Sequence, residues 1–206
     1  MTTRIGLVSD VHSSPGPLKQ ALEIFAAEGV DDIICAGDIA GYYDTLEPTI
    51  DLLTTANCKT IAGNHDLSWL ERPPHAGDER IRDYLQALPP TLELEIDGVR
   101  LLAVHANPPA EQRGGIRLLD QHGEPRPDRQ QEWTAKLSSL EHDLLIVGHT
   151  HQVYALRLGG VLVVNPGSTV FNHSCMIVSL PDLTVRSFAL GNRDIVACWN
   201  FGMLYR

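Results

Sequence analysis

The chain has 206 residues, with 26 acidic and 16 basic side chains, which give a formal net charge of −10. This length suits a single domain covering residues 1–206, with enough chain to bury a substantial core. The acidic balance argues against strong nucleic-acid binding, which needs clustered Lys and Arg, and no apolar run is long enough to cross a bilayer.

The first 90 residues alternate between apolar runs and helical spacing. Strands are expected over 4–9, 31–37 and 59–63. A helix is expected to begin at Pro17 and end at Gly29, because proline suits the first turn and glycine the residue after the last. Helical spacing recurs over 46–53 and 81–88. This alternation predicts a largely parallel sheet covered by helices.

The second half of the chain contains hairpin signals. Asp97–Gly98 joins the strand-like runs 91–96 and 99–104, and Gly159–Gly160 joins 154–158 to 161–165. A third pair of runs flanks Pro181–Asp182, and one further buried strand is expected over 143–148. We therefore expect a second sheet that faces the first.

A long polar stretch, residues 106–132, interrupts this second half. It is rich in Pro, Gly, Gln and charged residues. It is too long for a plain connection in a compact domain, so it is either a functional loop or a mobile one.

Polar side chains follow the apolar strands in a repeated pattern. Strand ends meet at one edge of a parallel sheet, where α/β proteins bind ligands. Taken singly, a strand-end Asp is more often a helix cap or turn residue. Five apolar strands that all end in His, Asp or Asn make that explanation insufficient. The residues concerned are Asp10, His12, Asp38, Asn64, His65, His105, His149 and His151.

Two pairs in this set, Asp10/His12 and His149/His151, are two residues apart. In an extended segment, residues with this spacing point to the same side. Each pair is therefore expected to offer two ligand atoms to one cavity.

The ordered motifs D-x-H at Asp10, GD at Asp38, GNHD from Gly63 to Asp66, VH at His105 and GHTH at His149 resemble the calcineurin-like metallophosphoesterases. Within that superfamily the chain looks most like the small, stand-alone bacterial and archaeal phosphodiesterase-type members. The resemblance implies a four-layer α/β/β/α sandwich, the metallo-dependent phosphatase fold.

The resemblance also implies a site for two divalent transition-metal ions. Asp38 would be shared by both ions. One ion would be held by Asp10, His12, Asp38 and His151, and the other by Asp38, Asn64, His105 and His149. Nitrogen and oxygen ligands without thiolate favour Mn, Fe, Co, Ni or Zn, and we favour Mn.

His65 is not needed as a ligand and resembles the family's general acid, which protonates the leaving group. Asp66 either orients that imidazole or caps the turn that follows. Two cations about 3.5–4 Å apart clamp a phosphoryl group and make a hydroxide available near neutral pH. The implied reaction is in-line attack by a metal-bridging hydroxide on the phosphorus atom of a small or nucleotide-like phosphoester.

Departures from the family pattern bear on the substrate. Phosphoprotein phosphatases of this superfamily carry an arginine after the bridging Asp, whereas residues 39–42 here read IAGY. A diester carries less charge and needs that clamp less, so a phosphodiesterase is favoured over a phosphomonoesterase on the same site. Ala106 replaces a usual glycine, and its methyl group would narrow access to the second metal. A non-catalytic adaptor that uses the fold surface is the alternative from another class.

Other polar and aromatic residues receive structural interpretations. Tyr42 and Tyr43 are candidates to line the substrate pocket, although aromatic packing is slightly favoured. Arg113 and Arg117 are candidates to contact a phosphate or a second substrate group, although a solvated loop is favoured. Asn165 and Ser168 match a family segment near the metals, although a turn explains them. Residues expected at the surface, without a role, are His75, His122, His142 and His173.

Four cysteines, Cys35, Cys58, Cys175 and Cys198, are scattered through mostly apolar segments. We expect reduced, buried thiols rather than disulfides or a zinc site. With no secretory leader visible, we expect a cytoplasmic protein whose partner is a small phosphoester. The substrate-binding residues and the oligomeric state stay open, with a homo-oligomer as one option.

Overall fold

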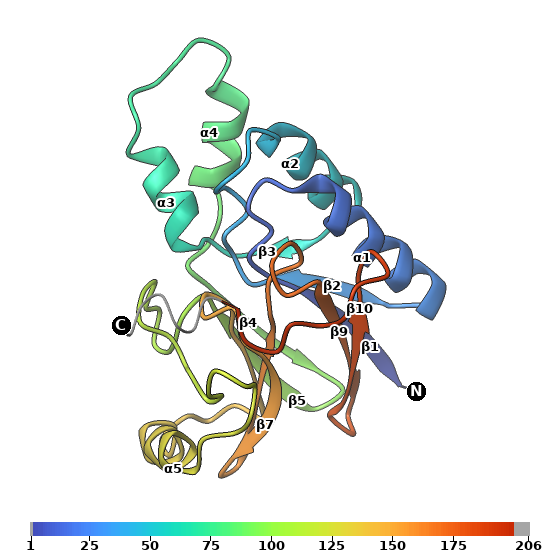
Figure 1. Ribbon diagram of the computed structural model, residues 1–206, viewed down its shortest axis with the longest axis vertical. Helices are drawn as coiled ribbons and strands as arrows, with labels where there is room; N and C mark the ends of the chain where they lie inside the picture. The colour runs from blue at the N-terminus through green and yellow to red at the C-terminus, as the bar shows by residue number, and fades with distance from the viewer. Residues whose placement is uncertain (1, 200–206) are drawn as a thin grey trace.

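The computed structural model describes residues 2–199 and contains two five-stranded sheets in that range (Figure 1). The first sheet has β1 and β2, and β2 and β3, paired in parallel, while β9 pairs antiparallel with both β1 and β10. Its strands, in spatial order, are β10 (Thr184–Ala189), β9 (Ser174–Leu180), β1 (Thr3–Val8), β2 (Asp32–Cys35) and β3 (Lys59–Thr60).

The second sheet is also mixed. Its strands, in spatial order, are β4 (Thr91–Ile96), β5 (Val99–Val104), β6 (Leu144–Ile146), β8 (Val161–Pro166) and β7 (Val153–Leu158). The pairs Ile96↔Val99 and Leu158↔Val161 close two of the predicted hairpins. The third joins β9 to β10. All three turn predictions are confirmed.

Helices cover the outer faces of both sheets, which gives the predicted four layers. On the first sheet, α1, α2 and α4 pack over the outer face, and α3 lies beside α4 (Figure 1). On the second, α5 and the segment that precedes it fill the outer layer. The bounds are α1 (Pro15–Glu28), α2 (Leu46–Thr55), α3 (Asn64–Leu70), α4 (Glu79–Gln86) and α5 (Pro127–Lys136).

The main core lies between the two sheets. Side chains such as Ile5 and Ile34 from the first sheet meet Leu101 and Ile146 from the second, and all four are fully buried. Burying this apolar surface fixes the two sheets face to face. Their strand ends are thereby held close together. Within residues 2–199, no helix combines the length and the apolar character needed to cross a membrane.

Some predicted boundaries were wrong. Helix α1 begins at Pro15, two residues before the predicted start, and ends as predicted at Gly29, whose φ of 66° is left-handed. Strand β3 is only two residues long. Helices α3 and α5 were not predicted, because neither shows clear apolar periodicity.

The polar stretch 106–132 is neither wholly a loop nor loosely attached. Its last residues form the start of α5. Before that helix, Ile116, Leu118 and Leu119 are buried against the second sheet. These apolar side chains anchor the segment, so Arg117, which lies between Ile116 and Leu118, has a defined position.

Candidate metal centre

The predicted ligands converge at one edge of the sandwich, and they come from both sheets. Asp10, Asp38 and Asn64 follow β1, β2 and β3 of the first sheet. His105 follows β5, and the pair His149/His151 follows β6, both of the second. Among the described residues, three overlapping groups have ligand atoms within 4.8 Å of one another: Asp10–His12–His151, His12–Asp38–His65 and Asp38–His105–His149.

The first group surrounds Asp10. His151 Nε2 lies 3.2 Å from Asp10 Oδ1 and 3.1 Å from His12 Nε2. Asp10 is also fixed from behind, because both of its carboxylate oxygens accept the backbone N–H of His149, at 3.1 and 3.0 Å. This group therefore presents one carboxylate and two imidazoles to a common point.

The second group surrounds Asp38. His105 Nε2 lies 3.3 Å from Asp38 Oδ1 and 3.2 Å from Asn64 Oδ1. His149 completes this group. Asp38 belongs to two of the three groups, with His105 and His149 in one and with His12 and His65 in the other, but not to the Asp10 group. The bridging role of Asp38 stays a prediction.

The backbone selects which imidazole nitrogen faces each cluster. His105 Nδ1 lies 2.8 Å from the Ala36 carbonyl oxygen, and His12 Nδ1 lies 3.3 Å from that of Ala40. A carbonyl can only accept, so Nδ1 carries a proton in each ring, and Nε2 is the nitrogen that faces the centre and would bind a cation once it is unprotonated. Metal-ligating histidines are normally oriented by such a partner. The donor set fits divalent cations.

The electrostatics of the groups are strongly coupled. Burial alone would raise the pKa of Asp10, but His151, His105 and His12 lower it well below its ordinary value. Burial would likewise lower the pKa of His105, but Asp38 outweighs it and raises that pKa to about 9. The carboxylates of the centre are therefore ionised and are stabilised by nearby positive charge. Bound cations would supply positive charge at the same place.

At His12 and His149 the net shift of the pKa is downward, because burial outweighs the nearby carboxylates. Burial lowers the pKa of each to about 4. Both imidazoles are therefore neutral at pH 7 and available as ligands, since a metal binds the unprotonated ring.

The backbone at these ligands is strained. Asp10, His12, Asp38, His149 and His151 have φ angles of 50°, 48°, 54°, 63° and 49°. Residues with a Cβ rarely adopt this left-handed region, and such conformations gather at functional sites. The reasoning from extended backbone was therefore wrong for both pairs. Tight turns, not strands, aim these side chains into one cavity.

Two glycines allow the backbone to approach the ligands closely. A Cβ at Gly63 would lie 2.2 Å from Asp38 Oδ1, and one at Gly148 would lie 2.7 Å from Asp10 Oδ2. Neither position has room for another side chain. These glycines precede Asn64 and His149 in the predicted motifs, and close approach explains their presence.

His65 lies beside the centre, half-buried and lining the same cavity as Asp38. Its backbone N–H donates to Asp38 Oδ1 at 2.8 Å. Its ring centroid lies 4.9 Å from that of His12. The structure therefore places the predicted general acid next to both candidate metal positions, although it also places the imidazole within reach of a ligand role.

Asp66 acts as a cap. Its Oδ1 accepts the backbone N–H of Ala40 at 2.7 Å, and its Oδ2 accepts that of Gly63 at 2.8 Å. The carboxylate thus caps the N-terminus of α3 at Gly63 and fastens the 38–41 turn to it. Burial, and after it the negative charge of Asp38, raise the pKa of Asp66 to about 7. Of the two roles considered for Asp66, the contacts support the cap.

We expect Asp66→Ala to destabilise the fold. Two buried N–H groups would lose their acceptor, at a cost of about 1–3 kcal/mol each. Urea unfolding should show this decrease in the free energy of unfolding. Asp66→Asn keeps one acceptor, so its free energy of unfolding should decrease less. Equal, near-zero losses in both variants would contradict the capping role.

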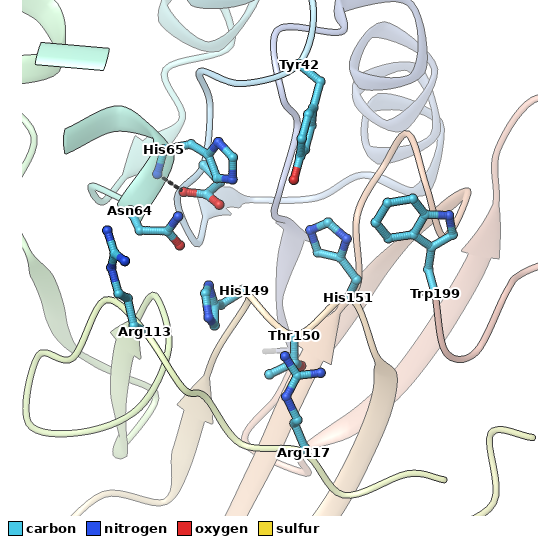
Figure 2. Close-up of a pocket in the computed structure, with 10 residues that line it drawn as sticks. Tyr42, Asn64, His65, Arg113, Arg117, His149, Thr150, His151 and Trp199 are labelled. Atoms are coloured by element: carbon cyan, nitrogen blue, oxygen red, sulfur yellow. Dashed lines mark hydrogen bonds between the residues drawn. The ribbon is translucent and has the colours of Figure 1, made fainter. Parts of the chain in front are cut away.

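A cavity of about 350 Å³ opens over the centre. Arg113, Arg117, Tyr42 and Trp199 line it, together with Asp38, Asn64, His65, His149, Thr150 and His151 (Figure 2). For Arg113, Arg117 and Tyr42 the structure thus favours the alternative that places them at a pocket, although Tyr42 also packs against the Phe171 ring. Trp199 was missed, since nothing around it in the sequence forms a motif.

Several minor predictions are settled by burial. Ala106 is fully buried, and it is not among the described residues that line the cavity. Tyr43 lines a different cavity from Tyr42. Asn165 and Ser168 are buried supports: Asn165 Nδ2 donates to the Gly148 carbonyl oxygen and Ser168 Oγ to that of Asp10, at 3.0 and 2.6 Å.

The remaining histidines and the cysteines largely follow expectation. His75 and His122 are exposed, whereas His142 and His173 are half-buried rather than fully at the surface. All four cysteines are free thiols. Cys35 and Cys175 are buried, and the other two are half-buried.

Comparison with known proteins decides the family. The model of the calcineurin-like phosphoesterase superfamily domain matches residues 3–180. The chain belongs to this superfamily. Phosphodiesterase MJ0936 of Methanocaldococcus jannaschii is 26% identical over 172 residues, which cover 80% of this chain and 82% of that protein.

Other superfamily comparisons agree on the architecture. The uncharacterized protein MJ0912 of the same archaeon is 28% identical over 123 residues, 50% of this chain and 49% of that protein, so this match spans about half of the relative. The crystal structure of hypothetical protein PH1004 from Pyrococcus horikoshii OT3 superposes with a TM-score of 0.74 and 20% identity, covering 94% of this chain and 89% of that one. This likeness shows the metallophosphoesterase fold.

Proposed function

We propose that the protein is a metal-dependent phosphodiesterase that hydrolyses small phosphoesters. The observation that carries the proposal is the set of three overlapping ligand groups, two of which share Asp38, beside one cavity that Asp38, His149 and His151 line. The name of the 26% identical relative, a phosphodiesterase, supports the same activity.

Seven side chains would hold two divalent cations. Their donors are nitrogen and oxygen only, which favours Mn, Fe, Co, Ni or Zn, with Mn the first choice. When bound, such a pair supplies Lewis-acid activation of the phosphoryl group and a nucleophilic water near neutral pH. The proposed ligands are Asp10, His12, Asp38, Asn64, His105, His149 and His151.

His65 would supply a proton to the departing oxygen. It reaches the cavity from the first turn of α3, where its own N–H binds Asp38 and fixes the backbone. A proton donor beside the phosphorus atom is what an alkoxide leaving group requires. Arg113 and Arg117 reach the same cavity from the opposite segment and offer positive charge to phosphate oxygens (Figure 2).

The diester assignment rests on residues 39–42, which contain no arginine beside Asp38. A phosphomonoesterase is the second candidate. Arg113 and Arg117 line the cavity, and their positive charge together with two cations would suit the dianion of a phosphomonoester. A non-catalytic adaptor is the remaining alternative.

Hydrolysis of bis(p-nitrophenyl) phosphate and p-nitrophenyl phosphate separates these candidates. We expect kcat/KM to be higher for the diester in protein loaded with Mn²⁺. A preference for the monoester would establish the phosphatase. If neither ester is hydrolysed after loading with Mn, Fe, Co, Ni or Zn, the adaptor becomes the better explanation. Metal analysis of the freshly purified protein identifies the native ions.

A further inference from the structure

Three aromatic residues form a wall beside the candidate centre: Tyr42, Phe171 and Trp199, hereafter the aromatic wall. Phe171 lies in its middle. Its ring stacks on Trp199, with centroids 4.1 Å apart and planes at 15°, and meets Tyr42 edge-on at 5.4 Å. The wall therefore consists of contacting rings from three segments far apart in the sequence.

The wall contacts the proposed catalytic residues directly. The Phe171 ring stacks on His151 with centroids 5.4 Å apart, and the Trp199 ring lies 5.2 Å from the same imidazole. Tyr42 lies 5.0 Å from His65 and 4.8 Å from His12. The wall therefore adjoins side chains that belong to the candidate centre.

Hydrogen bonds hold Trp199 in place. Its backbone N–H donates to the His151 carbonyl oxygen at 3.1 Å. The preceding residues are fixed too, since the Asn172 side chain donates to the carbonyl oxygens of His151 and Val196, at 2.9 and 2.6 Å. The segment that carries Trp199 is thereby attached to the same turn that carries a proposed ligand.

Packing alone does not account for the wall. Tyr42 is 58% exposed, although its ring contacts three others, those of His12, His65 and Phe171. Its hydroxyl end points into the cavity, and Trp199 faces the same space (Figure 2). Exposed rings fixed around a polar cavity are typical of ligand sites.

The cavity therefore has one side with positive charge and one side with aromatic rings. Arg113 and Arg117 line the side formed by the 106–126 segment, and Tyr42 and Trp199 of the aromatic wall line the side beside His151 (Figure 2). Phe171 supports Trp199 from behind by stacking on its ring. We propose that the aromatic wall stacks a planar ring carried by one ester group of the substrate, so that the substrate class is nucleoside or aryl phosphodiesters. This inference rests on the proposed function and specifies its substrate.

Equilibrium binding tests the inference without turnover. Titration calorimetry of the Mn²⁺-loaded protein compares thymidine 5′-monophosphate, phenyl phosphate, choline phosphate and glycerol 3-phosphate, which share a phosphate monoester. Base–aromatic stacking predicts that thymidine 5′-monophosphate binds about tenfold or more tightly than glycerol 3-phosphate. Phenyl phosphate in first place would assign an aryl ester instead of a nucleoside. Equal affinities, or choline phosphate in first place, would overturn the inference.

Variants locate the contact. Trp199→Leu should reduce the preference for thymidine 5′-monophosphate over glycerol 3-phosphate about tenfold. Trp199→Phe, which keeps a ring, should recover much of it. Tyr43→Leu is the matched control, because Tyr43 is 47% exposed beside Tyr42 but lines a different cavity. An unchanged preference in Trp199→Leu, with unaltered melting temperature, would refute the assignment of Trp199.

Turnover separates this inference from the proposed function. Thymidylyl-(3′→5′)-thymidine and glycerophosphoglycerol are both dialkyl diesters of the same charge, and only the first carries rings. Hydrolysis of bis(p-nitrophenyl) phosphate with no binding preference among the monoesters would leave the phosphodiesterase standing and remove the ring site. A binding preference without hydrolysis of any ester would support the ring site and remove the phosphodiesterase. Where both hold, the thymidine dinucleotide should be the better substrate.

Discussion

Asp38→Asn should abolish phosphodiester hydrolysis and lower the bound metal from the proposed two ions per chain to one or none. Asp38 belongs to two of the three ligand groups, and an amide cannot supply its negative charge to both. Loss of a residue that only orients a metal ligand typically weakens metal binding about 10–100-fold, so removal of the shared ligand itself should weaken it about a thousandfold or more. Metal analysis and kcat/KM for bis(p-nitrophenyl) phosphate measure both effects.

Melting temperatures provide an independent readout of the same variant. Cations that bind only the folded state stabilise it, by about 2.7 kcal/mol at a concentration one hundred times Kd. A chelator should therefore lower the melting temperature of the wild-type protein and affect Asp38→Asn much less. Asp44→Asn, an exposed change in the same loop, is the matched control. An unchanged wild-type melting temperature after verified metal removal would count heavily against the centre.

His65→Ala should lower kcat by about 10²–10⁴-fold, the usual contribution of a positioned proton donor, and leave the metal content unchanged. The His65 ring faces the cavity, while its backbone N–H, which the substitution keeps, binds Asp38. Steady-state kinetics and metal analysis on the same preparation measure the two quantities. His75→Ala, at an exposed histidine outside the cavity, controls for the loss of an imidazole.

The leaving group sharpens this test. A p-nitrophenolate leaves readily without a proton, whereas an alkoxide does not, so the defect of His65→Ala should be larger for a dialkyl diester. Loss of metal in the variant would instead move His65 into the ligand set. That outcome is chemically reasonable, because its imidazole forms a group with His12 and Asp38.

The sequence predicted the features that depend on local chemistry. Two-residue turns such as Asp97–Gly98 placed the hairpins correctly, because their backbone requirement is local. The strand-end pattern predicted which side chains gather, since parallel strands such as β1 and β2 end at the same edge. The match to the calcineurin-like phosphoesterase domain is consistent with the predicted hairpins and with the gathering of these side chains.

Other features depend on contacts that no short window contains. Tyr42 and Arg113 line the cavity only because separate loops fold over the same strand ends. The left-handed backbone at Asp10 and His149 could not be predicted from residue types. The prediction that extended backbone makes each pair point to one side was therefore wrong. Trp199 is positioned by hydrogen bonds to the turn at His151, far from it in sequence.

The division of the proposed ligands between two sheets has a consequence for biosynthesis. The first of them, Asp10, follows a strand of the first sheet, and the last, His151, follows a strand of the second. The Asp10–His12–His151 and Asp38–His105–His149 groups each draw side chains from both sheets, so neither forms until most of the chain has left the ribosome and the sheets have docked. Binding of cations by these two groups would therefore come after docking of the sheets.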